Sequence, residues 1–342
     1  MRNPPAVPDC PRLACIYLDY GLNLSHDRLY PCCPDSRYKR PEITFQGGDF
    51  PFEAFFELRK KTREGILEGT SPCLQCPNLV ESTDSPEEGI IRYITFNHFR
   101  ECNSRCCYCD FWRSGKKDVY RKRYSALPVF RQLLDEGCVP EDASVTWGGG
   151  EPALLEEFDE LMFLIAERNL ENFVNTNCLR FSPVLAEALK GRTRMQLSLD
   201  SGTDETYARV KGQNGFRRVV ENLRRYAEAN AGNITLKYIV AHGTDEPRDL
   251  LGFLDIAERL GISSIAISPE AGEVREKSIR EQSLDGAALL WRMARDRGIS
   301  VTAIESLFGQ AAMERIRPRA AHESKAVRWA KEMVRRLKGR MG

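Results

Sequence analysis

Three cysteines, Cys102, Cys106 and Cys109, lie close enough in the chain to hold a metal cluster. Their spacing is C-x3-C-x2-C, and they follow an apolar stretch, residues 90–96, that predicts a β-strand. Iron–sulfur clusters are held by Cys thiolates at short, fixed spacings. Four such cysteines would close the site, whereas three leave one iron open to bind a substrate or a cofactor.

An aromatic residue, Tyr108, precedes the last of these cysteines, and the run resembles the signature of the radical S-adenosylmethionine (radical SAM) superfamily. The resemblance implies that Cys102, Cys106 and Cys109 hold a [4Fe-4S] cluster. Its open iron would chelate the methionine end of SAM, and Tyr108 would pack near the adenine. In this superfamily an electron from the cluster cleaves SAM to a 5′-deoxyadenosyl radical, which abstracts a hydrogen atom from the substrate.

The composition limits the class of protein. The chain has 342 residues, 42% of them hydrophobic, which is enough for one large domain or a barrel with a small module. A net charge of +1 gives no reason to expect nucleic acid or a membrane as a partner. No apolar run approaches the roughly 20 residues that span a bilayer, and the N-terminus lacks a signal-peptide core. We therefore expect a cytoplasmic protein, in which the 12 cysteines favour metal ligation over disulfides.

Short apolar strands alternate with amphipathic helices over most of the chain. Strands are predicted at residues 90–96, 144–147, 172–175, 195–199, 234–240 and 264–267, and helices at 124–136, 153–168, 183–189, 216–229, 247–260 and 284–297. Six such units imply a parallel sheet, and an α/β fold with a partial (β/α)6 TIM-like barrel fits both this number and the resemblance. We assign the barrel to residues 89–310, a Cys-rich module to 1–88 and a basic C-terminal helix to 311–342.

A glycine-rich segment, Gly148, Gly149, Gly150 and Glu151, follows the second predicted strand. Active sites of βα barrels collect at this end of the strands, and glycine lets the backbone approach a ligand closely. Taken alone, the segment is equally typical of a tight turn into a helix. Downstream of the cysteine motif it resembles the GGE motif of radical SAM enzymes, which implies that it holds the methionine amino group of SAM.

Polar residues also follow the fourth predicted strand. Ser198 and Asp200 alternate with leucines, so both side chains could face the barrel mouth. They resemble the S-x-D of superfamily members with extra clusters, which implies that Ser198 contacts the SAM methionine or ribose and Asp200 the ribose or substrate. The next segment is similar to one that ends in Arg-Gly in the family, so either Arg209 or Lys211 would meet the SAM carboxylate. An N-capped helix with exposed charges is the structural alternative.

The third predicted strand ends in Asn177 and Cys178, where related enzymes often have Thr-Asn-Gly. Asn177 fits this pattern and is a candidate cofactor contact, whereas Cys178 departs from it. A thiol that faces the site could donate a hydrogen atom to a substrate radical, as in radical epimerases. The structural alternative, a small buried cysteine that fills a gap, is the one we favour.

A second set of cysteines lies in the N-terminal region. Cys73 and Cys76 form a C-x2-C knuckle, a strong local signal for metal ligands, while Cys15 and the pair Cys32 and Cys33 flank a predicted hairpin. The order of these cysteines and the hairpin between them resemble the twitch or SPASM-type auxiliary-cluster module of radical SAM enzymes. In those enzymes the module usually follows the barrel. The resemblance implies a second [4Fe-4S] cluster that relays electrons, with Cys32 or Cys33 as one ligand. Four thiolates suit a structural zinc equally well.

From these features we expect a radical SAM enzyme of oxidoreductase or epimerase type that takes a hydrogen atom from a polar small molecule or glycoside. Radical modification of a peptide is the alternative, because SPASM-type enzymes often act on peptides. An alternative of another class is a non-catalytic iron–sulfur or zinc-binding protein. The resemblance also implies a reducing partner such as flavodoxin or ferredoxin.

Overall fold

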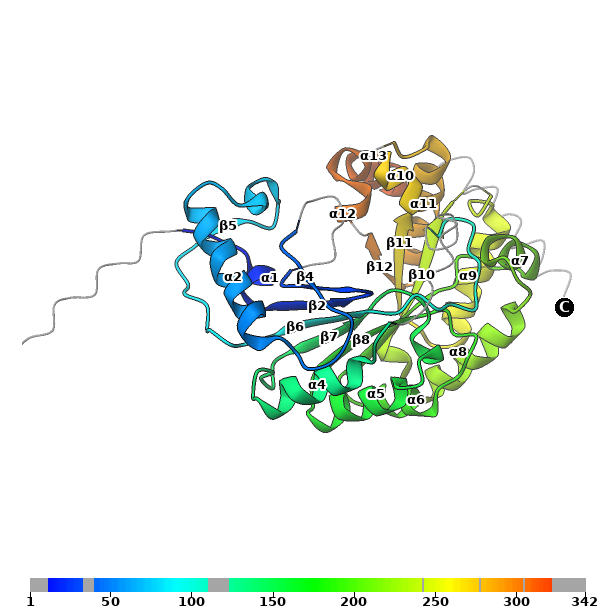
Figure 1. The fold of residues 1–342 in the computed structure, drawn as a ribbon. Coiled ribbons are helices and arrows are strands. Elements are labelled where there is room, and N and C mark those ends of the chain that lie inside the picture. The colour runs from blue at the N-terminus through cyan, green and yellow to red at the C-terminus, as the bar shows by residue number, and fades with distance from the viewer. Residues whose placement is uncertain are drawn as a thin grey trace, which may run out of the picture. The chain divides into compact units, whose positions relative to one another are not determined.

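The computed structural model describes residues 12–32, 40–109, 123–241, 243–276, 278–303 and 305–321 (Figure 1). These residues form two compact units, one within residues 1–101 and 118–173 and the other within 102–117 and 174–342. Cys33 and residues 322–342 of the predicted basic helix lie outside the described residues. No helix in the described ranges is long and apolar enough to cross a membrane.

The first unit contains a sheet in which parallel strands continue into an antiparallel hairpin, in the order β7-β6-β2-β3-β4. Its strands are β2 (Gly21–Ser25), β3 (Arg28–Tyr30), β4 (Ile43–Thr44), β6 (Tyr93–Asn97) and β7 (Ser144–Trp147). Two further strands, β1 (Arg12–Ala14) and β5 (Val80–Ser82), pair with each other. The predicted hairpin thus extends the parallel sheet, because β2 pairs with β6.

The helices of the first unit are α1 (Ile16–Tyr20), α2 (Phe52–Leu67), α4 (Ala126–Asp135) and α5 (Phe158–Glu167). Of these, α4 and α5 pack against the core face of β6 and β7. Alternate residues of β6 and β7 are buried, as expected for strands with one face in the core. Phe96 of β6 stacks edge-on against Phe130 of α4, and Trp147 of β7 against Phe158 of α5, with ring centroids 5.5 and 5.0 Å apart.

In the second unit, parallel strands run in the order β12-β11-β10-β9. The next strand after β9 is β8 (Glu171–Thr176), within which the chain leaves the first unit and enters the second. The other strands are β9 (Thr193–Ser198), β10 (Ile234–Val240), β11 (Ser264–Pro269) and β12 (Ser300–Ala303). The helices are α6 (Pro183–Ala188), α7 (Asp204–Lys211), α8 (Phe216–Asn230), α9 (Pro247–Arg259), α10 (Ala271–Arg275), α11 (Glu281–Arg295), α12 (Glu305–Phe308) and α13 (Gln310–Ala321).

The predicted succession of βα units is confirmed, since each of the six predicted strands is present and is followed by a helix. Side-chain caps fix several helix starts: Ser125 accepts from the amide of Leu127, and Ser182 from that of Leu185. The helix predicted over residues 153–168 is divided. A 3-10 turn, Pro152–Leu154, comes first, and α5 begins only at Phe158.

Candidate active site

The three-cysteine loop lies in the second unit and is fastened to the C-terminal end of α7. The amide of Arg105 donates to the carbonyl of Lys211 at 2.9 Å, and that of Cys107 to the carbonyl of Val210 at 2.9 Å. The last carbonyls of a helix have no partner within the helix, so the loop satisfies two of them. Gly212 ends α7 with φ +68°, and a Cβ there would lie 2.6 Å from the carbonyl oxygen of Arg105. Only glycine fits this contact.

Donors directed at sulfur show that the loop suits a cluster held by thiolates. The amide of Ser104 lies 3.4 Å from the Cys102 sulfur, and the Asn177 side-chain amide lies 3.6 Å from it. Such donors stabilise a thiolate and tune the metal that it binds. Cys107, which the spacing leaves out, is exposed. Among the described residues no group of three His, Cys, Asp or Glu converges on a single ion. A [4Fe-4S] cluster instead takes each cysteine on a different iron.

Two side chains brace the loop between its first two cysteines. Asn177 donates to the side-chain oxygens of Asn103 at 2.7 Å and Ser104 at 3.2 Å. Gln213, just after α7, donates to the carbonyl of Asn103 at 2.7 Å and the hydroxyl of Ser104 at 2.8 Å. The sequence interpretation included Asn177 but missed Gln213, which has no recognisable motif around it. Both residues therefore position the loop, and a direct contact of Asn177 with SAM stays a prediction.

Tyr108, Asp200 and Lys211 form a buried triad in the second unit. The Tyr108 hydroxyl donates to Oδ2 of Asp200, and the Lys211 ammonium lies 2.5 Å from the same oxygen and 2.8 Å from the Tyr108 hydroxyl. Oδ1 of Asp200 accepts from the amide of Ile239 at 2.7 Å. Asp200 is 0% and Lys211 2% exposed, so the ion pair is removed from solvent. The triad ties the cysteine loop to the ends of β9 and α7.

Burial and mutual contact set the charge states in this triad. Burial on its own disfavours the ammonium, but Asp200 and Cys106 outweigh it and raise the pKa of Lys211. Burial, with the Asp200 carboxylate next in effect, raises the pKa of Tyr108 well above its ordinary value. Lys211 is therefore charged and Tyr108 is neutral. The sequence made each member a candidate contact of the cofactor or substrate. In the structure their polar groups contact one another. The contacts with cofactor or substrate stay predictions.

Three further predicted residues of the second unit, Arg209, Ser198 and Cys178, differ in their exposure and contacts. The Arg209 guanidinium donates to the carbonyl of Gly243 at 2.5 Å and to the Thr206 hydroxyl at 3.4 Å. Ser198 is the last residue of β9 and is partly exposed. Cys178 is 0% exposed and adopts φ +62°, a conformation that favours glycine. Its role as a hydrogen donor stays a prediction, and its buried thiol agrees with the structural alternative.

The glycine-rich turn lies in the first unit and approaches the backbone that leads into the cysteine loop. Gly149 has φ +85°, and the Gly150 amide donates to the carbonyl of Phe99 at 3.3 Å. The Glu151 amide donates to the carbonyl of Glu101 at 2.7 Å. Glu151 is 1% exposed, and its carboxylate caps the 3-10 turn through the amide of Ala153.

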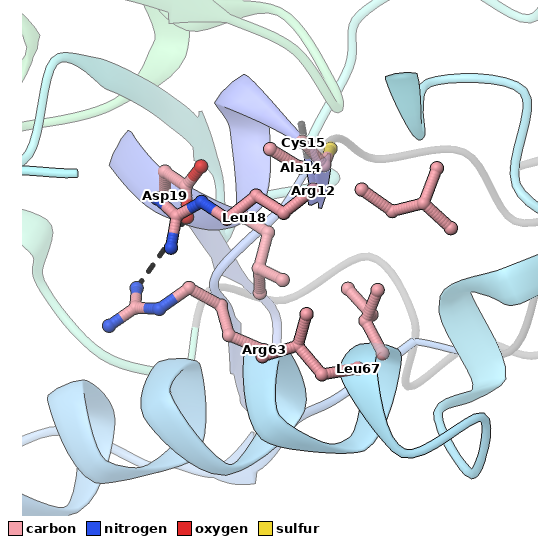
Figure 2. A pocket seen from close by; sticks show the side chains of 9 residues that line it. Arg12, Ala14, Cys15, Leu18, Asp19, Arg63 and Leu67 are labelled. Carbon is pink, nitrogen blue, oxygen red and sulfur yellow. Dashed lines mark ion pairs between the residues drawn. The ribbon is translucent and has the colours of Figure 1, made fainter. Parts of the chain in front are cut away.

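The N-terminal cysteines lie in the first unit. Cys15 is buried with Leu18 and Ile66, and Cys73 packs against this cluster. Cys73 lies in a 3-10 turn, Pro72–Gln75, and Cys76 caps its C-terminal end, where the Cys76 amide donates to the carbonyl of Cys73 at 2.9 Å. Figure 2 shows that Cys15 lines a pocket together with Asp19 and Arg63, whose charged groups are 3.6 Å apart. Cys32 is partly exposed.

Several curated proteins are similar to part of this chain. Mycofactocin maturase MftC of Mycobacterium ulcerans is 27% identical over 188 residues, 54% of this chain and 49% of that protein. Sporulation killing factor maturation protein SkfB of Bacillus subtilis is 28% identical over 156 residues, 44% of this chain and 36% of that protein. A probable GTP 3′,8-cyclase of Saccharolobus solfataricus is 24% identical over 174 residues, 50% of this chain and 54% of that protein. The matches thus span about half or less of each relative.

A solved structure and a family model complete the comparison. The crystal structure of Streptococcus suis SuiB matches with a TM-score of 0.50 and 12% identity over 76% of this chain and 58% of that chain, which supports the α/β fold alone. The family model described as Radical SAM superfamily matches residues 96–255, which contain the cysteine loop and the glycine-rich turn. Residues 96–255 therefore match the radical SAM superfamily, whose enzymes bind a [4Fe-4S] cluster and SAM.

Proposed function

We propose that this chain modifies a peptide by radical chemistry. The observation that carries the proposal is the cysteine loop, with donors directed at the Cys102 sulfur, in a domain whose relatives include two named for maturation. Those names favour a peptide over the polar small molecule or glycoside expected from the sequence. The cyclase relative keeps a small nucleotide as the second candidate substrate.

The residues of this chain would hold and orient the reactants. When bound, the cluster and SAM supply a 5′-deoxyadenosyl radical that can abstract a hydrogen atom. Cys102, Cys106 and Cys109 would be the cluster ligands. Glu151 is a carboxylate suited to the methionine ammonium, and its burial would strengthen that contact. Ser198, at the end of β9, would contact the ribose or methionine.

Activity of the anaerobically reconstituted protein tests this proposal directly. With SAM, a chemical reductant and synthetic peptides encoded beside its gene, we expect one peptide to increase the formation of 5′-deoxyadenosine. That peptide should also change mass, and Cys106→Ala should abolish both effects. A fully reconstituted sample that forms no 5′-deoxyadenosine would contradict the assignment as an enzyme. Stimulation by GTP or a glycoside, and by none of the peptides, would contradict the substrate class.

We further propose that the N-terminal cysteines hold an auxiliary [4Fe-4S] cluster. Two observations support this proposal. Cys73 packs against the hydrophobic group that contains Cys15, and a local turn holds Cys73 and Cys76 close together. Such a cluster would accept the electron left on a substrate radical. The fourth ligand would be Cys32 or Cys33.

Metal analysis distinguishes this cluster from zinc. We expect about eight iron atoms per reconstituted chain and about four in a variant with Cys73→Ala and Cys76→Ala. Cys138→Ala, which removes a cysteine outside both sets, should leave the iron content unchanged. About four iron atoms with one zinc in the parent protein would reject the auxiliary cluster and support the structural zinc site.

A further inference from the structure

A row of polar side chains crosses one face of the sheet in the second unit. On β10, Leu236 and Tyr238 are buried, and the Tyr238 ring lies 4.9 Å from that of Phe253 in α9. Successive strand residues point to opposite faces, so Lys237 lies on the face away from α9. Its register partner on β9 is Ser198, a predicted SAM contact.

The same face continues with neutral hydrogen-bonding groups on the neighbouring strands. Gln196 of β9 donates to Oδ1 of Asn175 in β8 at 3.0 Å. Thr235, two residues before Lys237 on β10, donates to the Ser264 hydroxyl of β11 at 3.3 Å. Amides and hydroxyls satisfied by one another in this way can bind a polar ligand but do not neutralise a cation. None of these four residues is anionic, so the row supplies no counterion to Lys237.

Three cations lie in this part of the second unit, and two of them have partners. Lys211 is paired with Asp200, and Arg209 donates to the carbonyl of Gly243. The Lys237 ammonium forms no hydrogen bond or ion pair within the described ranges. Of these three cations, it alone has no such partner there.

The position of Lys237 makes an anion its natural partner. Burial lowers the pKa of Lys237, and the like charge of Lys211 adds to this effect, while Asp200 opposes it. A half-buried cation without a partner is costly, because it has lost part of its hydration. An anionic group that accepts a charge-assisted hydrogen bond would offset this cost.

The resemblance to the radical SAM family gives the SAM carboxylate a different cation, Arg209 or Lys211. Lys237 matches no motif of the family. We therefore assign its anion to another molecule.

We propose that Lys237 binds a carboxylate of the substrate, either an acidic side chain or the C-terminus of a peptide. This inference rests on the peptide function proposed above, and it deepens that function by naming the group through which the substrate is oriented. The Lys237 ammonium would fix one end of the peptide while the residue that loses its hydrogen atom is held toward the cluster.

Protection of Lys237 from acylation tests this site without relying on turnover. The reconstituted protein is treated with an N-hydroxysuccinimide ester, and the modification of Lys237 is followed by mass spectrometry. Three pools of short peptides are added in turn: acidic peptides with an amidated C-terminus, neutral peptides with a free C-terminus, and neutral amidated peptides. We expect one of the first two pools to slow the acylation of Lys237, and the neutral amidated pool and SAM to leave it unchanged. Lys190, on the surface, is the internal reference.

Substitution provides the second measurement. Lys237→Met should raise the concentration of the protecting pool needed to stimulate 5′-deoxyadenosine formation by roughly ten- to a hundredfold, as the loss of a charged hydrogen bond implies. Lys237→Arg should retain most of the effect, and the Kd for SAM should change by less than about twofold in both variants.

The outcomes separate this inference from the proposed function. Protection by SAM alone, or by none of the pools, would overturn the assignment of Lys237 to a substrate carboxylate. A Kd for SAM that rises in Lys237→Met as much as the peptide requirement would do the same. If a carboxylate pool protects Lys237 but no peptide is modified, the anion site stands and the peptide function fails.

Discussion

Replacing Asp200 by Asn is expected to lower the free energy of unfolding by about 3–5 kcal/mol, because it leaves a buried ammonium without its counterion. Asn keeps the shape of Asp and tolerates the positive φ of +58° at this position, so the change alters charge and hydrogen bonding without altering size. Lys211 is 2% exposed and cannot recover its hydration without opening the site. Unfolding in urea, followed by circular dichroism, measures the loss.

The double variant Asp200→Asn with Lys211→Met is the matched control. Removing both charges eliminates the unpaired ion, so the double variant should regain at least half of the lost stability. Cluster content provides a separate measurement, because Tyr108, whose hydroxyl donates to Asp200, lies between Cys106 and Cys109 in the chain. We expect fewer iron atoms per chain in the single variant. A single variant within about 0.5 kcal/mol of the parent protein, or a double variant no better than the single, would refute the structural role of the ion pair.

Local patterns in the sequence were sufficient to predict most of the fold. The alternation along β6 and β10 and the run of apolar residues in α9 predict these elements to within a few residues. Pairing between distant segments could not be predicted in this way. β2 was expected in a hairpin, and nothing local indicates that it also pairs with β6. β12, with only the four residues Ser300–Ala303, is too short for a recognisable period.

The candidate site shows the same limit. Tyr108, Asp200 and Lys211 were each identified by a motif, yet their mutual contacts join positions 92 and 103 residues apart. A motif gives the type of a residue but not the partner that its charge finds in the fold. Consequently the sequence left the SAM carboxylate to either Arg209 or Lys211 and made no assignment for Lys237, which lies within a strand and belongs to no motif.

Gly150→Ala is expected to destabilise the first unit by about 2–3 kcal/mol, since the new methyl group would overlap with backbone atoms of a neighbouring segment. A Cβ at Gly150 would lie 1.9 Å from the carbonyl oxygen of Glu101 and 2.7 Å from the carbonyl carbon of Arg100. That carbonyl of Glu101 also accepts the hydrogen bond from the amide of Glu151. Relief of the clash must therefore displace the backbone that immediately precedes Cys102 in the chain.

Gly148→Ala, two residues away in the same turn, is the matched control. Its Cβ would meet nothing closer than 3.7 Å, the side-chain oxygen of Asn97, and we expect a change within about 0.5 kcal/mol. Thermal unfolding and the Kd for SAM should both distinguish the two variants: Gly150→Ala should lose stability and SAM affinity, and Gly148→Ala should keep both. If Gly150→Ala unfolds like the parent protein, the close contact with Glu101 does not constrain the turn. If it loses stability but binds SAM normally, the turn supports the fold without holding the cofactor, and the resemblance to the GGE motif would not extend to its role.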